Sequence, residues 1–369
     1  NMPPVTLTNS YDARGNRTSV SDNIATGGTI NFSYDAINRQ TLAALTVGGV
    51  AGPQVSFGYD AASRLTSLSR QVGNSQFTEK TDSTFNYDNA DRLTGITHRY
   101  SPFMGSPTTL ATYTYAYNAA SELTNETNQD GSFTYTYDNT SQLTGVDASG
   151  GSCGATGCDE SFSYDVNGNR TMTGYTTGTS NRLTADGTYT YTYDDNGNML
   201  QKTKTSNGEK TEFTWEFRNR LTQVVVKDSS NNILQESNYT YDAFNRRIIK
   251  SFDDDGPGPH SATVAKTIYE GPSFAANPYA DFDGSNTLTM RYLYGPAVDM
   301  VLARRNASGT VAWYLTDHLG TVRDLVNIGG SVIDHISYSA YGKVSAESSP
   351  SNGDRFKFTA REYDSDIDL

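Results

Sequence analysis

The sequence has little of what marks metalloproteins, disulfide-rich proteins or nucleic-acid-binding proteins. Its 369 residues include only two Cys, four His, and 28 Lys or Arg against 41 Asp or Glu, so the net charge is −13. This charge repels a phosphate backbone, which argues against nucleic acid as a partner. No apolar run reaches the roughly 18 to 20 residues that a membrane-spanning helix needs, so no membrane span is expected. A signal peptide is also lacking, but Tyr11 already stands inside a repeat, so this lack says little.

The two cysteines, Cys153 and Cys158, lie in a glycine-rich stretch and are separated by four residues. Such a stretch can fold back and bring the Cα atoms within the roughly 7 Å that a disulfide needs. A disulfide is the favoured interpretation, and free thiols are the alternative. Half of a zinc site is least favoured, because zinc needs about four ligands and no His lies nearby.

The abundant residues favour strands and turns over helices. There are 25 Tyr and 33 Gly with many Thr, Ser and Asn, while 35% of the residues are hydrophobic. Tyr and Thr suit a pleated, half-buried surface, and Gly and Asn suit the turns between strands. The composition therefore predicts an all-β protein.

A Tyr-Asp pair recurs through much of the chain at gaps of 20 to 30 residues. This spacing gives each unit room for about two strands and two turns. Another aromatic residue stands two places earlier, as Tyr135 does before Tyr137, so one face of the strand carries a row of rings. The aromatic residues at the Tyr-Asp position, here called the repeat anchors, are Tyr11, Tyr34, Tyr59, Tyr87, Tyr117, Tyr137, Tyr164, Tyr193, Phe217 and Tyr241.

The residues after each anchor predict a tight turn and a return strand. In the stretch YDNADRLT that begins at Tyr87, Asp88 can accept hydrogen bonds from the amides ahead of it, and Leu93 begins the next strand. An isolated hairpin is marginal in water, and adjacent strands rotate by about 20 to 25°. The hairpins are therefore expected to form one long twisted antiparallel sheet that curls into a spiral shell, a barrel or a partial cocoon.

Three units depart from the pattern: Asn118 replaces Asp, Arg218 follows Phe217 with a shortened turn, and Gln40 replaces Leu. The period continues towards the C-terminus, which predicts further hairpins with longer loops. The expected parts are a hairpin array over residues 1–250, an irregular connector that continues the strands over 251–290, and a terminal core over 291–369. The aromatic residues that continue the period are Tyr269, Tyr294, Tyr314, Tyr341 and Tyr363.

The terminal core resembles the Rhs-associated core of Rhs, YD-repeat and toxin-complex proteins, and the Tyr-Asp units resemble their YD repeats. The resemblance implies that the sheet winds into a hollow shell, that the core seals one end, and that a C-terminal toxin of the parent chain lies inside. Family shells generally carry far more repeats, so this chain is expected to form the terminal part of a shell or an open coil. The blocks that carry the resemblance are Tyr294-Gly295-Pro296, the run from Trp313 to Arg323 with Asp317, His318 and Gly320, the run from Tyr338 to Tyr341 and Gly342, Arg355-Phe356, and Arg361-Glu362-Tyr363-Asp364.

No enzymatic activity is expected. The family's self-cleavage motif contains Asp-Pro, and this sequence has no Asp-Pro dipeptide. No recognisable motif places a nucleophile beside His98, His260, His318 or His335, so structural roles are predicted for them. The block from Arg361 to Asp364 is expected to form a salt-bridged strand end.

Two acidic stretches resemble pieces of calcium-binding loops. They begin at Asp194 and Asp281, and they place carboxylate and amide oxygens at alternate positions. Thr203 and Met290 stand where such a loop needs its bidentate Glu. Turns are therefore expected, without a metal or a cofactor.

The sequence thus predicts a non-enzymatic shell segment of a secreted or cell-surface bacterial protein, with a C-terminal toxin or effector as its cargo. The alternative is an extracellular adhesion or filament-forming module. In that case unpaired strand edges would join copies of the chain into a homo-oligomer or filament.

Overall fold

The chain folds into β-strands over most of its length. The computed structural model describes residues 1–73, 79–150, 158–271 and 277–367. Where aromatic residues and Thr alternate, successive side chains point to opposite faces of an extended backbone. The first sheet has 13 strands, which are β1 (Leu7–Tyr11), β2 (Arg17–Asp22), β3 (Gly28–Tyr34), β4 (Gln40–Val47), β5 (Val50–Tyr59), β6 (Leu65–Val72), β7 (Lys80–Tyr87), β8 (Leu93–Ser101), β9 (Thr108–Tyr117), β10 (Leu123–Asn128), β11 (Gly131–Tyr137), β12 (Leu143–Ser149) and β13 (Glu160–Ser161).

The second sheet follows the first in the chain. Within the described ranges, no helix is long and apolar enough to cross a membrane. The sheet has 16 strands, which are β14 (Tyr175–Thr177), β15 (Leu183–Asp186), β16 (Tyr189–Tyr193), β17 (Met199–Lys204), β18 (Lys210–Trp215), β19 (Leu221–Lys227), β20 (Ile233–Tyr241), β21 (Arg247–Asp253), β22 (Thr263–Tyr269), β23 (Pro278–Asp283), β24 (Leu288–Tyr294), β25 (Val301–Asn306), β26 (Val311–Thr316), β27 (Val322–Asn327), β28 (Val332–Tyr338) and β29 (Val344–Glu347). Short 3₁₀ turns are η1 (Thr179–Asn181), η2 (Pro350–Asn352) and η3 (Phe358–Ala360).

Strands that follow one another in the chain are also neighbours in each sheet, and they pair antiparallel. The predicted all-β fold of successive hairpins is therefore confirmed. The ribbon is nevertheless divided into two sheets between β13 and β14. There Tyr164 and Arg170 form an isolated bridge, and the chain turns again at Gly174, whose φ is +86°. Glycine adopts such a positive φ readily, and β14 begins at the next residue.

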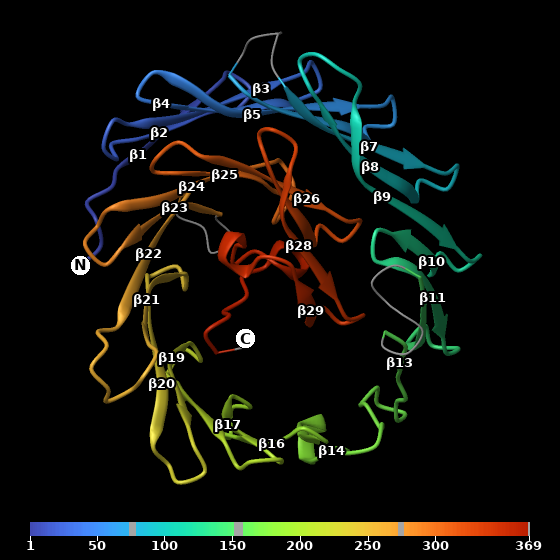
Figure 1. The fold of residues 1–369 in the computed structure, drawn as a ribbon, viewed down its shortest axis with the longest axis vertical. Coiled ribbons are helices and arrows are strands. Elements are labelled where there is room, and N and C mark those ends of the chain that lie inside the picture. The colour runs from blue at the N-terminus through green and yellow to red at the C-terminus, as the bar shows by residue number, and fades with distance from the viewer. Residues whose placement is uncertain (74–78, 151–157, 272–276, 368–369) are drawn as a thin grey trace.

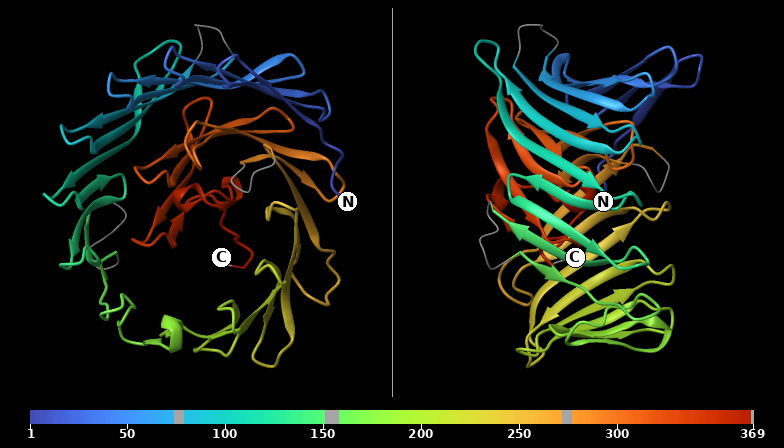
Figure 2. Two further views of the ribbon diagram at one scale, coloured as in Figure 1. Left: turned by 180° about the vertical axis from the view of Figure 1, so that it is seen from behind. Right: turned by 90° about the vertical axis from the view of Figure 1, so that its right-hand side faces the viewer.

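The two sheets form one spiral (Figure 1). The strands from β1 to β13 run along the outer wall, those from β14 to β22 complete the turn, and β23 to β26 come to lie inside β1 to β5. The same overlap is visible from behind in Figure 2, and β24 contacts β4 while β25 contacts β5. The predicted curling into a spiral shell is confirmed, with ends that overlap.

A buried apolar core fills the overlap between the two layers. Val20, Leu45 and Val55 of the outer layer pack against Leu302 and Trp313 of the inner layer, and each is at most 2% exposed. Full burial of such a side chain contributes about 1.5 to 3 kcal/mol. The overlap is therefore a principal source of stability for the coil.

A buried ion pair crosses the same overlap. Arg291 Nη2 lies 2.8 Å from Asp22 Oδ1, and the two side chains are 2% and 0% exposed. Tyr279 donates a hydrogen bond to Asp22 Oδ2 at 2.7 Å. Gly28 lies so close that a Cβ there would stand 2.6 Å from Asp22 Oδ2. This pair, here called the seam, fixes the register of the inner layer on the outer one.

The terminal core has a second buried cluster inside the coil. The Phe356 ring makes edge-on contacts with the rings of Tyr292, Tyr294 and Tyr314, at centroid distances of 5.2, 6.2 and 6.3 Å. The expected boundaries at residues 250 and 290 fall inside β21 and β24. Strand pairing runs through both boundaries, since β21, β22, β23 and β24 are consecutive neighbours in the second sheet.

We expect Asp22→Asn to lower the free energy of unfolding by about 3 to 5 kcal/mol, because it leaves the buried Arg291 without a counter-charge. Asp91→Asn is the matched control. This substitution removes the ion pair between Asp91 and Arg64, in which the Asp91 side chain is 75% exposed. It should lower the free energy of unfolding by about 0 to 1 kcal/mol. Urea unfolding followed by fluorescence measures both losses. Equal losses would contradict a stabilising role for the seam.

Candidate functional site

Each repeat turn is closed by one carboxylate or its replacement. Asp88 Oδ1 accepts hydrogen bonds from the amides of Ala90 at 2.8 Å and Arg92 at 3.0 Å, and Oδ2 accepts from Arg92 Nε at 2.7 Å. The backbone hydrogen bond from Arg92 is the main cause that lowers the pKa of Asp88. The residue just before Arg92, Asp91, has a φ of +64°, as a three-residue hairpin loop with a bulge requires. Equivalent positive-φ positions are Gly15, Asn38, Ser63, Ser121, Ser141, Gly168, Gly197, Asn219, Asn245, Gly320 and Gly342.

Each turn also binds the next repeat. Arg92 Nη1 donates to the carbonyl of Asn118 at 3.0 Å, and its guanidinium lies 5.1 Å from the centre of the Tyr117 ring. The Tyr117 hydroxyl in turn donates to the carbonyl of Leu93 at 2.8 Å. We call this set of contacts the inter-repeat clamp.

The hydroxyl bond of the clamp recurs along both sheets. Apart from Tyr11 and Phe217, each anchor donates to the carbonyl at the start of the preceding return strand. Tyr11 ends the first strand of the first sheet and is 62% exposed. The tyrosines that make the bond, at 2.7 to 2.9 Å, are Tyr34, Tyr59, Tyr87, Tyr117, Tyr137, Tyr164, Tyr193, Tyr241, Tyr269 and Tyr338.

The structure corrects the anchor predicted at Phe217. That residue lies in the turn and is 86% exposed, whereas Trp215 ends β18. Trp215 Nε1 donates to the carbonyl of Met199 at 2.7 Å and so replaces the tyrosine hydroxyl. Glu216 takes the place of Asp and pairs with Arg220. The turn has its usual length, and the shortened turn that was predicted here is wrong.

Within the terminal core, the positions predicted at Tyr314 and Tyr341 are also shifted, whereas Tyr294 ends β24 as expected. Tyr338, rather than Tyr341, ends β28 and donates to the carbonyl of Val322. Tyr341 lies in the following turn, where its hydroxyl is 2.5 Å from that of Tyr164 on the outer wall. Tyr314 stands inside β26, and Thr316 ends that strand. The motif Asp-His-Leu-Gly is therefore a repeat turn whose anchor is not aromatic.

The other core blocks mostly form turns and contacts between walls. Gly295 donates its amide to the carbonyl of Met300 at 2.8 Å, which closes the turn that contains Pro296. Asp317 Oδ1 accepts from the amides of Leu319 and Thr321 at 2.9 and 3.1 Å. Burial raises the pKa of Asp317.

The last block ties the chain end to the wall of the coil. Glu362 pairs with Arg247 at 2.8 Å and with Arg355 at 3.1 Å. The buried Asp364 pairs with Arg247 and Lys250. Tyr363 follows an isolated bridge between Phe356 and Glu362, and Arg361 pairs with Asp299 at 2.8 Å. The block therefore makes salt bridges, but it ends no strand, and the strand end that was predicted here is wrong.

The histidines lie in four different settings. His98 is buried, with Nδ1 2.7 Å from Ser83 Oγ. Burial and the nearby Arg70 lower its pKa to about 3. Ser83 is itself fully buried, so this pair offers no reachable nucleophile. The His318 ring lies 4.5 Å from that of Tyr115, and the exposed His260 contacts Asp254 at 3.0 Å.

His335 bridges two walls, which the sequence did not reveal. Its Nδ1 lies 2.7 Å from Asp324 Oδ1 and its Nε2 lies 2.8 Å from Asp130 Oδ1. Asp130 belongs to the turn between β10 and β11, and also pairs with Arg323. The hydrogen bonds to Asp130 and Asp324 raise the pKa of His335 to about 9. Asp130 and His335 are 205 residues apart, so this contact leaves no local pattern in the sequence.

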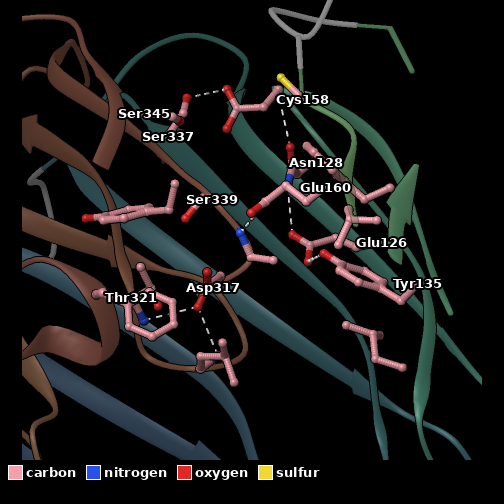
Figure 3. A pocket seen from close by; sticks show the side chains of 18 of the residues that line it. Glu126, Asn128, Tyr135, Cys158, Glu160, Asp317, Thr321, Ser337, Ser339 and Ser345 are labelled. Carbon is pink, nitrogen blue, oxygen red and sulfur yellow. Dashed lines mark hydrogen bonds between the residues drawn. The ribbon is translucent and has the colours of Figure 1, made fainter. Parts of the chain in front are cut away.

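A cavity of about 520 Å³ lies beside this bridge, between the outer wall at β10 to β13 and the terminal core. Glu126, Tyr135 and Glu160 line it from the outer wall, and Asp317 and Tyr338 line it from the core. Figure 3 shows Glu126 and Tyr135 on one side facing Asp317 and Ser339 on the other. The cavity is the candidate binding site of the described structure.

The two calcium-like stretches are turns or wall contacts. Asp194 closes the turn between β16 and β17, and Asp283 closes the turn between β23 and β24. Asp281 is an ion-pair partner of Arg355. The predicted disulfide involves Cys153, which lies outside the described residues, so it stays a prediction.

These features define a class, a spiral β-shell of YD-type hairpins whose C-terminal part lies inside the coil. The family model described as Teneurin YD-shell matches residues 119–369. The chain belongs to the Teneurin YD-shell family. The resemblance to Rhs and YD-repeat shells is thereby confirmed. No curated protein matches the chain.

Solved toxin-complex structures have the same fold. The crystal structure of TcdB2-TccC3 matches with a TM-score of 0.64 and 16% identity, over 98% of this chain and 20% of that chain. A Photorhabdus luminescens Tc holotoxin pore with a mutation in TccC3 matches with a TM-score of 0.63 and 16% identity, over 98% of this chain and 19% of that chain. The likeness shows the fold alone, and this chain spans about one fifth of the length of those chains.

We expect Trp215→Ala to lower the free energy of unfolding by about 2 to 4 kcal/mol, because it removes a half-buried ring and the clamp hydrogen bond. Phe217→Ala is the matched control and should change it by less than about 0.5 kcal/mol. Urea unfolding measures both. If Phe217→Ala lowers the free energy of unfolding more than Trp215→Ala does, Phe217 is the anchor and the correction is wrong.

His335 should make stability depend on pH. Its pKa is about 9 in the fold and near 6.5 unfolded, so its contribution is complete below pH 6.5 and is lost as pH rises through 9. Between pH 6.5 and 9.5 the loss should be about 3 kcal/mol. Unfolding of wild type and His335→Gln across this range measures it. Substitution of the exposed His260 by Gln should leave most of the dependence of unfolding free energy on pH unchanged. The same pH dependence in wild type and His335→Gln would contradict the bridge.

Proposed function

We propose that this chain is the wall and inner closure of a protein shell that holds a polypeptide, the C-terminal toxin or effector of its parent chain. The observation that carries the proposal is the position of the C-terminal segment, which lies inside the coil (Figure 1). A polypeptide attached to this end would start within the space that the strands surround.

The contacts of the chain end support this function. Asp364 is 6% exposed and is held by Arg247 and Lys250 of β21, and Tyr239 donates to it at 3.0 Å. Ile367 is buried with Phe213 and Val224. These contacts direct the end along the inner wall. The container role needs no catalytic residue, and the proposed setting is a secreted or cell-surface bacterial protein.

Enclosure can be tested by attaching a short unfolded peptide with a specific protease site to Leu369. We expect cleavage at least about tenfold slower than when the same peptide is attached to Asn1, which lies at the outer edge of the coil. The two fusions share sequence and fold, so they control for the site itself. Equal rates by gel and mass spectrometry would reject enclosure.

A second candidate is assembly through a strand edge. β1 has one neighbour in the first sheet, and four of its five residues are exposed. An unpaired edge can add a strand from another copy. On this alternative, light scattering shows a mass that rises with concentration, and Asn9→Pro within β1 restores the monomer. A constant monomer mass removes it.

A further inference from the structure

Glu126 is a buried acid that faces the cavity. It lies on β10, is 6% exposed, and lines the space between the outer wall and the terminal core. Its Oε1 accepts from Asn128 Nδ2 at 2.7 Å, and its Oε2 accepts from the Tyr135 hydroxyl at 3.3 Å. These neutral donors orient the carboxylate towards the cavity in Figure 3.

No cationic side chain of the described residues forms an ion pair with Glu126. The nearby Arg323 pairs with Asp130 and lies 3.8 Å from Asp317. His335 is held by Asp130 and Asp324. A buried carboxylate without an ion-pair partner is costly. Arg323 also lines the cavity and attracts Glu126, but it is paired with Asp130, so the acidic side chains of the described lining outnumber its cations.

The other acids of the cavity add to this excess of negative charge. Glu160 Oε1 accepts a hydrogen bond from the amide of Ala340 at 2.6 Å. Asp317 accepts from backbone amides, as described above, and has Arg323 as its distant cation. The two carboxylates come from opposite walls, so a ligand between them meets negative charge on both sides (Figure 3).

The lining also has an apolar and aromatic part, beside the polar side chains of Asn128, Thr321 and Ser337 and the cation Arg323. Leu123, Phe133 and Tyr135 come from the outer wall, and Tyr338 and Phe358 come from the core. Such a surface suits an aliphatic stem, and aromatic faces attract a cation within about 6 Å. The volume of about 520 Å³ falls in the usual range for a ligand site.

We infer that this cavity binds an alkylammonium or guanidinium group, with Glu126 as its counter-charge and Glu160 and Asp317 as the flanking acids. The source favoured by the position of the cavity inside the coil is a Lys or Arg side chain of the enclosed polypeptide. That source rests on the proposed function. A free polyamine carries the same chemistry and is distinguished by the test.

The test uses isothermal titration of the whole chain with the tripeptide acetyl-Gly-Lys-Gly-amide. Its match, acetyl-Gly-norleucine-Gly-amide, has the same aliphatic stem without the charge. We expect the lysine peptide to bind at least about tenfold more tightly than the norleucine peptide, and its affinity to fall with added salt. Equal affinity for both peptides, or no saturable binding of the lysine peptide, overturns the inference.

Variants locate the binding. Glu126→Gln keeps the shape and hydrogen-bonding capacity of the side chain, and should weaken the lysine peptide by about tenfold. Glu160→Gln is a second variant, should the first fail to fold, and should weaken it by about threefold. Glu212→Gln is the control, since Glu212 on β18 pairs with Lys227 on β19 and does not line the cavity. Wild-type affinity in both cavity variants overturns the assignment.

Two further arms separate the sources. Binding of acetyl-Gly-Arg-Gly-amide alongside the lysine peptide supports a polypeptide ligand, whereas binding of spermidine without either peptide overturns that source. The result is also independent of the enclosure test. Slow cleavage of the attached peptide without binding of the lysine peptide would overturn this inference and leave enclosure supported. Binding of the lysine peptide with equal cleavage rates would reject enclosure and leave the cation site supported.

Discussion

The inter-repeat clamp is the interaction on which the whole coil depends. An arginine such as Arg92 is bound at once by its own turn carboxylate, by the next turn's carbonyl and by the next anchor ring. The anchor hydroxyl then bonds back to the earlier repeat. Each repeat is therefore completed by its neighbours, as in other solenoids, where stability is close to a sum of nearest-neighbour terms. Where Asn198 replaces Arg, its amide bonds to Asn219 of the next turn and keeps the connection.

The coil is also closed by contacts between distant strands. The seam joins Asp22 to Arg291, and the His335 bridge joins the core to the turn at Asp130. Clamps alone would give a ribbon of the right curvature with a free inner end. The buried charges select one placement of the inner layer, because a shifted layer would leave them unpaired.

The hairpin order and most anchors could be predicted, because each depends on residues close in the chain. Trp215 was not predicted as an anchor, because its ring nitrogen donates the hydrogen bond that a tyrosine hydroxyl donates in the other repeats. Tyr338 was passed over for Tyr341 because spacing does not distinguish a strand end from a turn. Ser63 and Ser121 at positive φ also gave no signal. The seam, the His335 bridge and the cavity join residues far apart in the chain, so no local pattern encodes them.

The overlap restricts how many hairpins one turn of the coil can contain. Adjacent strands lie about 4.8 Å apart, so gaining or losing one hairpin between β2 and β24 would slide the inner layer by roughly 10 Å along the outer one. Asp22 would then face a different strand from the one that carries Arg291. Duplication of a repeat would preserve the contacts between neighbouring hairpins. It would nevertheless be destabilising, because it would break the contacts in the overlap. Repeat number can therefore drift in a ribbon without an overlap, whereas here it is held constant between β2 and β24.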